Sequence, residues 1–230
     1  MKLHGLQKMT LLDFPGHVAC TVFLGGCDFR CPFCHNFELV DGTAPPVMED
    51  TEFFDFLDTR HGLLDGVAVT GGEPCLHKGL PDFLARCRDM GFATKLDTAG
   101  YHPDMVELLL ERGLVDYVAM DVKNSPEKYA LTCGVDAIDM EPVKRSIALL
   151  MDSGIEYEFR TTCIDQFHTA QDIEAIARMI EGAQHYFLQA FTDRDTVPYE
   201  GFSAPSAEKM RAYAEIARRY IPSAEVRGVE

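Results

Sequence analysis

The sequence predicts an α/β protein with one parallel sheet. Short apolar runs rich in Val, Phe, Tyr and Thr alternate with longer amphipathic segments along almost the whole 230-residue chain. Six strand–helix units in succession indicate parallel strands joined by right-handed crossovers. A doubly wound sheet and a curved, incomplete barrel both fit this alternation, and the periodicity alone leaves the choice open.

The strands are expected where a short β-prone run ends at or just before a Gly, an Asp or another polar residue. We predict strands at residues 19–24, 66–70, 92–97, 117–122, 157–164 and 186–191.

The helices are expected where apolar residues recur at helical spacing between these strands. Val143, Ile147 and Leu150 show this spacing, and the Ser-Ala-Pro-Ser segment at 203–206 can cap the last helix. No repeat or convincing linker interrupts the chain, so we expect one domain over 1–230, with its core at about 18–192. We predict helices at residues 48–59, 80–90, 103–111, 139–151, 169–180 and 207–220.

Composition and charge exclude several classes of protein. The formal net charge of −16 leaves no basic footprint for nucleic acid or an anionic membrane. No apolar run approaches the ~18 residues of a membrane span. Asp13 and Pro15 interrupt the N-terminal segment where a secretory signal needs an unbroken apolar core. We therefore expect a cytoplasmic protein, in which eight cysteines argue for thiols and metal ligands rather than disulfides.

Every predicted strand carries or leads into a polar or cysteine-containing segment. Because parallel strands place their C-terminal ends on one face, these groups should converge on a single mouth. The segments are residues 27–34, 70–74, 97–100, 121–123 and 160–162, together with Gln189.

Cys27, Cys31 and Cys34 form a C-x3-C-x2-C pattern on one short loop. Three thiolates can hold three irons of a four-iron cluster and leave the fourth iron open for chemistry, so the spacing predicts a catalytic cluster. A zinc site with Cys20 or His35 as fourth ligand is the alternative, although structural zinc sites usually use two paired motifs. The other cysteines are most simply small buried hydrophobes.

Other strand-end residues have structural interpretations as well as functional ones. Residues 71–74, Gly-Gly-Glu-Pro, fit a tight turn with a solvated Glu. Asp97 and Asp121 could cap the helices that follow them, and Lys123 could be a charged side chain in solvent.

Arg160 is harder to explain structurally, because it lies inside an apolar strand between Phe159 and Thr161. A buried guanidinium needs an anionic partner, so we expect an anionic group next to Arg160. His35 and Asn36, in contrast, are suited to hold the cysteine loop in place by hydrogen bonds.

Together these motifs resemble the radical S-adenosylmethionine (SAM) superfamily. Residues 27–34 match its C-x3-C-x-aromatic-C loop, with Phe33 as the aromatic residue, and residues 71–74 match its Gly-Gly-Glu-Pro motif. The resemblance covers nearly the full chain and implies a partial (βα)6 TIM-like barrel of the radical SAM type.

Within that superfamily the chain is most similar to activating enzymes of glycyl-radical proteins. The closest likeness is to the activating proteins of anaerobic ribonucleoside-triphosphate reductase. The segments that carry this likeness are residues 12–16, 29–36, 96–100, 121–123 and 187–189.

The likeness implies that Cys27, Cys31 and Cys34 hold a 4Fe–4S cluster, whose open iron binds the amino and carboxylate groups of SAM. One electron, from a flavodoxin- or ferredoxin-type donor, then cleaves SAM to methionine and a 5′-deoxyadenosyl radical. This radical takes a hydrogen atom from a glycine of a partner glycyl-radical enzyme, here anaerobic ribonucleoside-triphosphate reductase.

The likeness also assigns roles around SAM. Gly71 and Gly72 let backbone carbonyls approach the cofactor, because no Cβ intervenes. Glu73 accepts from the ammonium group of SAM. Lys123 pairs with its carboxylate as a point charge, and Asp121 binds the ammonium or orders Lys123.

Three further assignments rest on the same likeness. Phe33 offers a face to adenine. Arg160 contacts the carboxylate or ribose of SAM. Asp97 and Thr98 coordinate a monovalent cation beside the cofactor, as in some relatives.

The chain departs from the family pattern at three points. Ala99 replaces an asparagine that makes a loop hydrogen bond, and residues 188–191 lack a histidine that touches the cofactor in some activators of pyruvate formate-lyase. The inserted cysteines of larger activases are absent, so we expect no auxiliary cluster.

Three alternatives stay open at this point. They are a radical enzyme acting on a small molecule, a zinc-binding interaction module, and an electron carrier. Carriers usually saturate all four irons with cysteine, which this loop does not provide.

Overall fold

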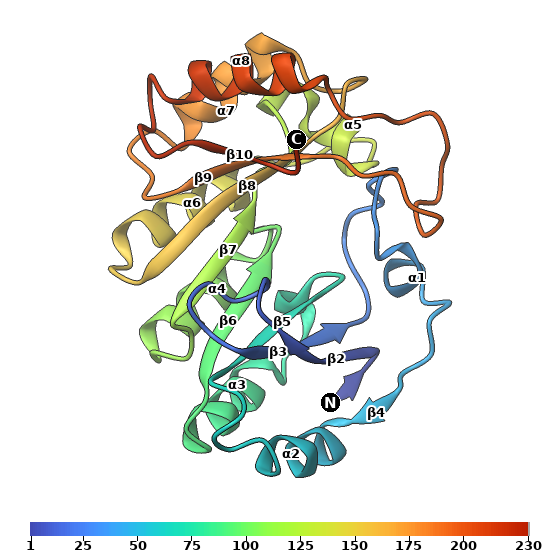
Figure 1. Cartoon of the computed structure of the whole chain (residues 1–230), viewed down its shortest axis with the longest axis vertical. Coiled ribbons are helices and arrows are strands. Elements are labelled where there is room, and N and C mark those ends of the chain that lie inside the picture. The colour runs from blue at the N-terminus through green and yellow to red at the C-terminus, as the bar shows by residue number, and fades with distance from the viewer. Residues whose placement is uncertain (230) are drawn as a thin grey trace.

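The computed structural model of the chain describes residues 1–229. Within this range eight strands form one curved sheet, in the order β10-β9-β8-β7-β6-β5-β3-β2 (Figure 1). All neighbours pair in parallel except β2, which runs antiparallel to β3. The strands are β2 (Gly5–Thr10), β3 (Ala19–Leu24), β5 (Gly66–Gly71), β6 (Ala93–Thr98), β7 (Tyr117–Asp121), β8 (Glu156–Cys163), β9 (Tyr186–Ala190) and β10 (Glu225–Arg227). Two short strands, β1 (Lys2–Leu3) and β4 (Met48–Glu49), form a separate antiparallel pair.

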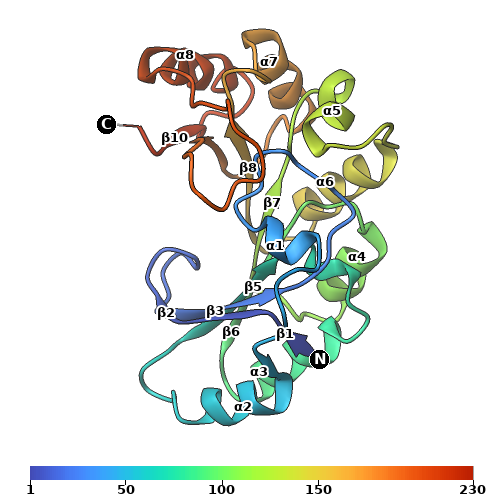
Figure 2. The same ribbon diagram turned by 90° about the vertical axis from the view of Figure 1, so that its right-hand side faces the viewer.

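Helices cover the outer, convex side of the sheet (Figure 2). Their starts follow local signals: Thr169 and Asp172 form a capping box before α7, and Pro occupies the first turn of α3, α4 and α6. No helix within residues 1–229 is long and apolar enough to cross a membrane. The helices are α1 (Phe37–Val40), α2 (Asp50–Asp58), α3 (Leu80–Asp89), α4 (Pro103–Glu111), α5 (Tyr129–Cys133), α6 (Glu141–Asp152), α7 (Ala170–Met179) and α8 (Ala207–Ala217), with single 3-10 turns at Pro74–Leu76 and Pro126–Lys128.

The structure confirms the predicted α/β class and the partial barrel. All six predicted strands and the six predicted helices are present, with ends that differ by a few residues. The edge strands β2 and β10 and the short helices α1 and α5 were not predicted. β2 and β10 join the sheet through backbone pairing. Because their side chains are largely exposed and of mixed type, their sequences show little hydrophobic pattern.

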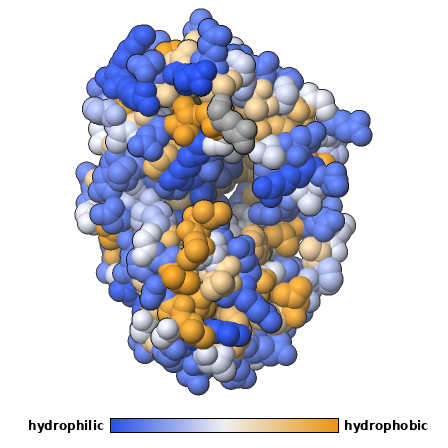
Figure 3. Space-filling view, viewed as in Figure 1, coloured by the Kyte–Doolittle hydropathy of each residue, from blue (hydrophilic) through white to orange (hydrophobic). Residues whose placement is uncertain are grey.

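The side of the barrel between β2 and β10 is open. Within the described residues these strands are the two edges of the sheet and do not pair with each other. The space-filling view of this face shows a hollow between the half that carries β10 and the half that carries β2 (Figure 3). Apolar side chains gather on the β2 side of the hollow in the same view.

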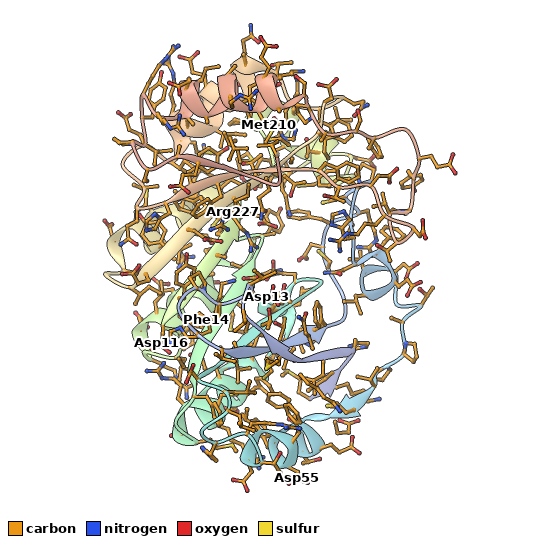
Figure 4. The ribbon with its side chains drawn as sticks, in the orientation of Figure 1. Asp13, Phe14, Asp55, Asp116, Met210 and Arg227 are labelled. Atoms are coloured by element: carbon orange, nitrogen blue, oxygen red, sulfur yellow. The ribbon has the colours of Figure 1, made fainter. Side chains whose placement is uncertain are left out.

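The loop between β2 and β3 closes the N-terminal end of the barrel. Phe14 on this loop is 1% exposed and packs with Ala19, Tyr117 and Ala119 at the starts of β3 and β7. A Cβ on Gly66 would lie 2.9 Å from the Phe14 ring, so this glycine leaves room for it. Figure 4 shows Asp13 and Phe14 on this loop and Arg227 across the open face. The Phe14 ring therefore fills the N-terminal end of the barrel, and the C-terminal strand ends face the space that remains.

We expect Phe14→Ala to lower the free energy of unfolding by about 3 kcal/mol, because it removes a buried aromatic ring and leaves a cavity. Urea unfolding followed by circular dichroism measures the change. Leu12→Ala is the matched control: Leu12 is 90% exposed on the same loop, so its loss should cost less than about 0.5 kcal/mol. Equal effects of the two substitutions would show that Phe14 does not support this end of the barrel.

Candidate active site

A cavity of about 230 Å³ lies at the C-terminal ends of the parallel strands. Segments far apart in the sequence contribute to its wall, as the common direction of the strands predicts. Neither Glu73 nor Gln189 is part of the lining, although both were among the predicted strand-end groups. The predicted site residues that line it are Cys27, Cys31, Phe33, Cys34, Gly71, Gly72, Asp97, Thr98, Asp121, Lys123 and Arg160.

The cysteine loop is held by hydrogen bonds to its backbone. Arg30 donates from Nη1 to the carbonyl of Cys27 at 2.7 Å and from its backbone N–H to the carbonyl of Cys133 at 2.8 Å. At the other end, His35 Nε2 lies 2.7 Å from the carbonyl of Thr192, and Asn36 Nδ2 donates to the carbonyl of Gly71 at 3.2 Å. His35 and Asn36 therefore act as the loop-fixing groups that the sequence indicated.

The three thiols have different proton affinities. Burial raises the pKa of Cys27 to about 12 and also raises the pKa of Cys34. Cys31 differs, because the neighbouring Cys133 thiol lowers its pKa. Cys133, at the end of α5, is fully buried and was read from sequence as a simple hydrophobe. A bound cluster would lower the pKa of these thiols and hold them as thiolates.

The donor set fits an iron–sulfur cluster. Cys27, Cys31 and Cys34 line one cavity, and cysteine thiolates are the usual ligands of such clusters. Of the two fourth ligands in the zinc alternative, Cys20 is a core residue of β3 outside the lining, whereas His35 lines the same cavity.

Gly71 and Gly72 are required by a close approach of two backbones. A Cβ on Gly71 would lie 2.3 Å from the carbonyl oxygen of Leu24, and one on Gly72 would lie 1.9 Å from that of Gly26. Gly71 also has a φ of 122°, which side chains disfavour. The N–H of Gly72 donates to Leu24, and the N–H of Glu73 donates to Gly26, each at 2.8 Å. The missing Cβ atoms therefore admit the chain that leads into the cysteine loop.

Glu73 lies behind the cavity wall, where it is 1% exposed. Its oxygens accept from the Cys75 N–H at 2.9 Å, the Thr98 hydroxyl at 2.8 Å and the Ala99 N–H at 2.7 Å. Burial raises its pKa. The solvated-turn interpretation is therefore wrong, and the carboxylate holds the loop after β6 in place from below. The Ala99 backbone keeps a hydrogen bond here despite the missing asparagine side chain.

Four charged side chains form a network across β6, β7 and β8. Arg160 donates to Asp121 at 2.9 Å and lies 3.4 Å from Asp97, which confirms that this guanidinium has anionic partners. Lys123 donates to the other oxygen of Asp121 at 2.8 Å. Burial alone would raise the pKa of Asp121, but the Arg160 and Lys123 charges hold it well below its ordinary value. Despite burial, Asp121 also keeps the pKa values of Lys123 and Arg160 above their ordinary ranges.

Sequence reasoning missed two charged residues that extend this network. Lys95 is 2% exposed and donates to Asp97. Glu158, also 2% exposed, accepts from Tyr117 at 2.8 Å and from Arg227 at 3.1 Å. Lys95 and Glu158 precede Asp97 and Arg160 by two residues, so they share a strand face with them. The sequence signal that could have identified Lys95 and Glu158 is a charged residue two positions before a predicted site residue.

Comparison with known proteins identifies the family of this chain. The Radical SAM superfamily profile matches residues 21–180. The chain belongs to the radical SAM superfamily. A protein of Methanocaldococcus jannaschii named "Putative glycyl-radical enzyme activating enzyme" is 31% identical over 98% of this chain and 95% of its own length. The pyruvate formate-lyase-activating enzyme of Clostridium pasteurianum is 34% identical over 54% of this chain, which spans about half (52%) of that relative.

Solved structures show the same fold at low identity. Streptococcus suis SuiB bound to S-adenosylmethionine has a TM-score of 0.70 at 12% identity, covering 90% of this chain and 48% of that chain. A domain of pyruvate-formate lyase-activating enzyme from Bacteroides vulgatus has a TM-score of 0.59 at 21% identity, covering 71% of this chain and 99% of that domain. These matches agree with the partial barrel of the radical SAM superfamily.

We expect Glu73→Gln to lower the free energy of unfolding by about 2 kcal/mol, because one amide oxygen cannot serve all three donors and the NH₂ group faces one of them. Thermal and urea unfolding measure the loss. Glu111→Gln, at an exposed position on α4, is the matched control and should be neutral within about 0.5 kcal/mol. An unchanged Glu73→Gln protein would show that these hydrogen bonds do not hold the loop.

Proposed function

We propose that this radical SAM protein is a cytoplasmic activase that takes a hydrogen atom from a glycine of a partner anaerobic enzyme. The observation that carries the proposal is the meeting of three thiols with the Lys123–Asp121–Arg160 network in one cavity. When bound, a 4Fe–4S cluster and SAM supply a 5′-deoxyadenosyl radical by one-electron reductive cleavage. Anaerobic ribonucleoside-triphosphate reductase is the partner that the sequence motifs favour, with a flavodoxin- or ferredoxin-type electron donor.

Cys27, Cys31 and Cys34 would hold the cluster. Hydrogen bonds of Arg30 and Asn36 hold the two ends of their loop. Three thiols leave one iron without a protein ligand, which is the position where SAM would bind.

Lys123 would bind the carboxylate of SAM, and Asp97 and Asp121 would face its ammonium group. The resemblance assigned that ammonium to Glu73, but Glu73 lies outside the cavity lining and accepts from three donors of its own. Lys123 remains protonated because Asp121 lies 2.8 Å away, and it lines the cavity together with both carboxylates. Arg160 balances these carboxylates from β8, so the site keeps both signs of charge at close range. This pattern suits a zwitterionic amino-acid group. Phe33, also in the lining, remains the proposed face for adenine.

The open side of the barrel would admit the partner. The hollow between the β2 and β10 halves in Figure 3 lies on the concave side of the sheet. An extended loop that carries a glycine needs this kind of access, because its backbone must reach the strand ends. The two relatives described above carry names of activating enzymes of this kind, which supports the proposal.

Anaerobic electron paramagnetic resonance tests the function directly. We expect a glycyl-radical doublet when reconstituted protein is mixed with SAM, dithionite and anaerobic ribonucleoside-triphosphate reductase. A doublet with pyruvate formate-lyase alone would reassign the partner. SAM cleavage without a doublet on either protein would instead favour the small-molecule alternative.

Cys27→Ala should lose the cluster absorbance, most of its iron and SAM cleavage, since one of three ligands is gone. Iron analysis and visible absorbance measure this without any activity. Cys87→Ala is the matched control, because Cys87 is a buried core residue of α3 outside the cavity. If Cys27→Ala kept full iron and SAM cleavage, the ligand assignment would be wrong.

We also propose, from the resemblance, that Asp97 and Thr98 hold a monovalent cation beside the cofactor. Asp97 accepts one hydrogen bond on each oxygen, from Lys95 and from Arg160, and the Thr98 hydroxyl donates to Glu73, so oxygen lone pairs remain on both residues. Replacing K⁺ by tetramethylammonium at constant ionic strength should therefore weaken SAM binding, and an unchanged Kd would show that no cation binds there. A loss of affinity of about tenfold, restored by K⁺, would show that a cation does bind there.

A further inference from the structure

Lys123 begins a loop that is tied to the segment between β8 and α7. His168 on that segment is fully buried and does not line the cavity. Its Nε2 lies 3.0 Å from the backbone carbonyl of Lys123. The next residue, Asn124, donates from Nδ2 to the carbonyl of Phe167 at 3.4 Å. Two successive residues after β7 are therefore anchored to the same segment.

The neighbours of His168 select one tautomer of its ring. The backbone N–H of Ile164 points at Nδ1 from 3.0 Å, so Nδ1 must offer a lone pair. The carbonyl of Ile164 is 3.3 Å from Nδ1 and already accepts from the His168 backbone N–H at 2.9 Å. The ring proton therefore resides on Nε2 and is donated to the Lys123 carbonyl.

His168 is held firmly from the far side. The hydroxyl of Tyr213, on α8, donates to its backbone carbonyl at 2.6 Å. Burial lowers the pKa of His168, with Asp172 acting to raise it and Lys128 to lower it, so the neutral ring persists at neutral pH. The imidazole is thus a rigid, neutral bridge between the helical layer and the Lys123 backbone.

We infer that His168 is a positioning residue for Lys123, and through it for the carboxylate of SAM. The inference rests on the proposed function, in which the Lys123 ammonium binds that carboxylate. The ammonium sits on a flexible stem of four carbons, so its backbone must be fixed for the charge to be presented beside Asp121. The hydrogen bond from Nε2 provides this, because it acts on the carbonyl of Lys123 itself.

Two substitutions separate positioning from mere support of the fold. His168→Gln can place an amide N–H where Nε2–H is and so keep the Lys123 bond while losing the Ile164 bond. His168→Asn can place an oxygen where Nδ1 is and so keep the Ile164 bond while losing the Lys123 bond. Each variant loses one buried hydrogen bond, so their melting temperatures should fall by similar amounts.

The readout is the Kd for SAM of the reconstituted, unreduced protein, measured by anaerobic equilibrium dialysis. His168→Asn should weaken binding by about three- to tenfold, the value of one hydrogen bond, and His168→Gln should stay within about twofold of the unsubstituted protein. Decarboxylated SAM is the matched ligand: it lacks the group that Lys123 holds, so its Kd should not distinguish the Asn and Gln variants. Equal losses of SAM affinity in both variants would overturn the inference.

Lys123→Ala distinguishes failure of the inference from failure of the proposed function. If Lys123→Ala weakens SAM binding and His168→Asn does not, the positioning role alone is wrong. If Lys123→Ala leaves the Kd unchanged, the carboxylate assignment fails and the role of His168 fails with it. If the unsubstituted, iron-loaded protein binds no SAM, the proposed function itself is wrong.

Discussion

The contact on which the site depends is the close approach of the end of β5 to the chain that enters the cysteine loop. Gly71 and Gly72 have no Cβ, and backbone atoms of Leu24 and Gly26 occupy the space where those Cβ atoms would lie. The two hydrogen bonds across this contact fix the position of the cysteine loop relative to the end of β5. Glu73, the next residue, turns inward and holds the loop after β6, so one short segment places two walls of the cavity.

The opposite wall depends on charge. Asp121 accepts from both Lys123 and Arg160, and Asp97 is a second anionic partner of Arg160. Lys95 and Glu158 continue the alternation of charge along the concave face, down to Arg227 on β10. A partial barrel with an open side lets such a face stay polar, because water and ligands reach it where a closed barrel would need apolar layers.

The local sequence predicted much of the fold. The six inner strands contain short apolar runs, because the helix-covered face of each strand is buried in the core. The edge strands β2 and β10 escaped prediction, since half-exposed side chains leave no such pattern. The site followed from the direction of parallel strands, which brings their C-terminal ends together whatever the details of packing. The inward orientation of Glu73 could not be predicted, because its three donors come from two different loops.

The sequence by itself determined the chemistry available: three thiols on one loop, a Gly-Gly-Glu-Pro turn, and charged residues at the strand ends. Residue types and local spacing carry this information, since they act within a few positions along the chain. Only the tertiary structure decided which groups meet. The contacts of Cys133 with Cys31, of Arg160 with Asp121 and of His168 with the Lys123 carbonyl each join separate segments. Such partners are set by how strands and helices pack in space.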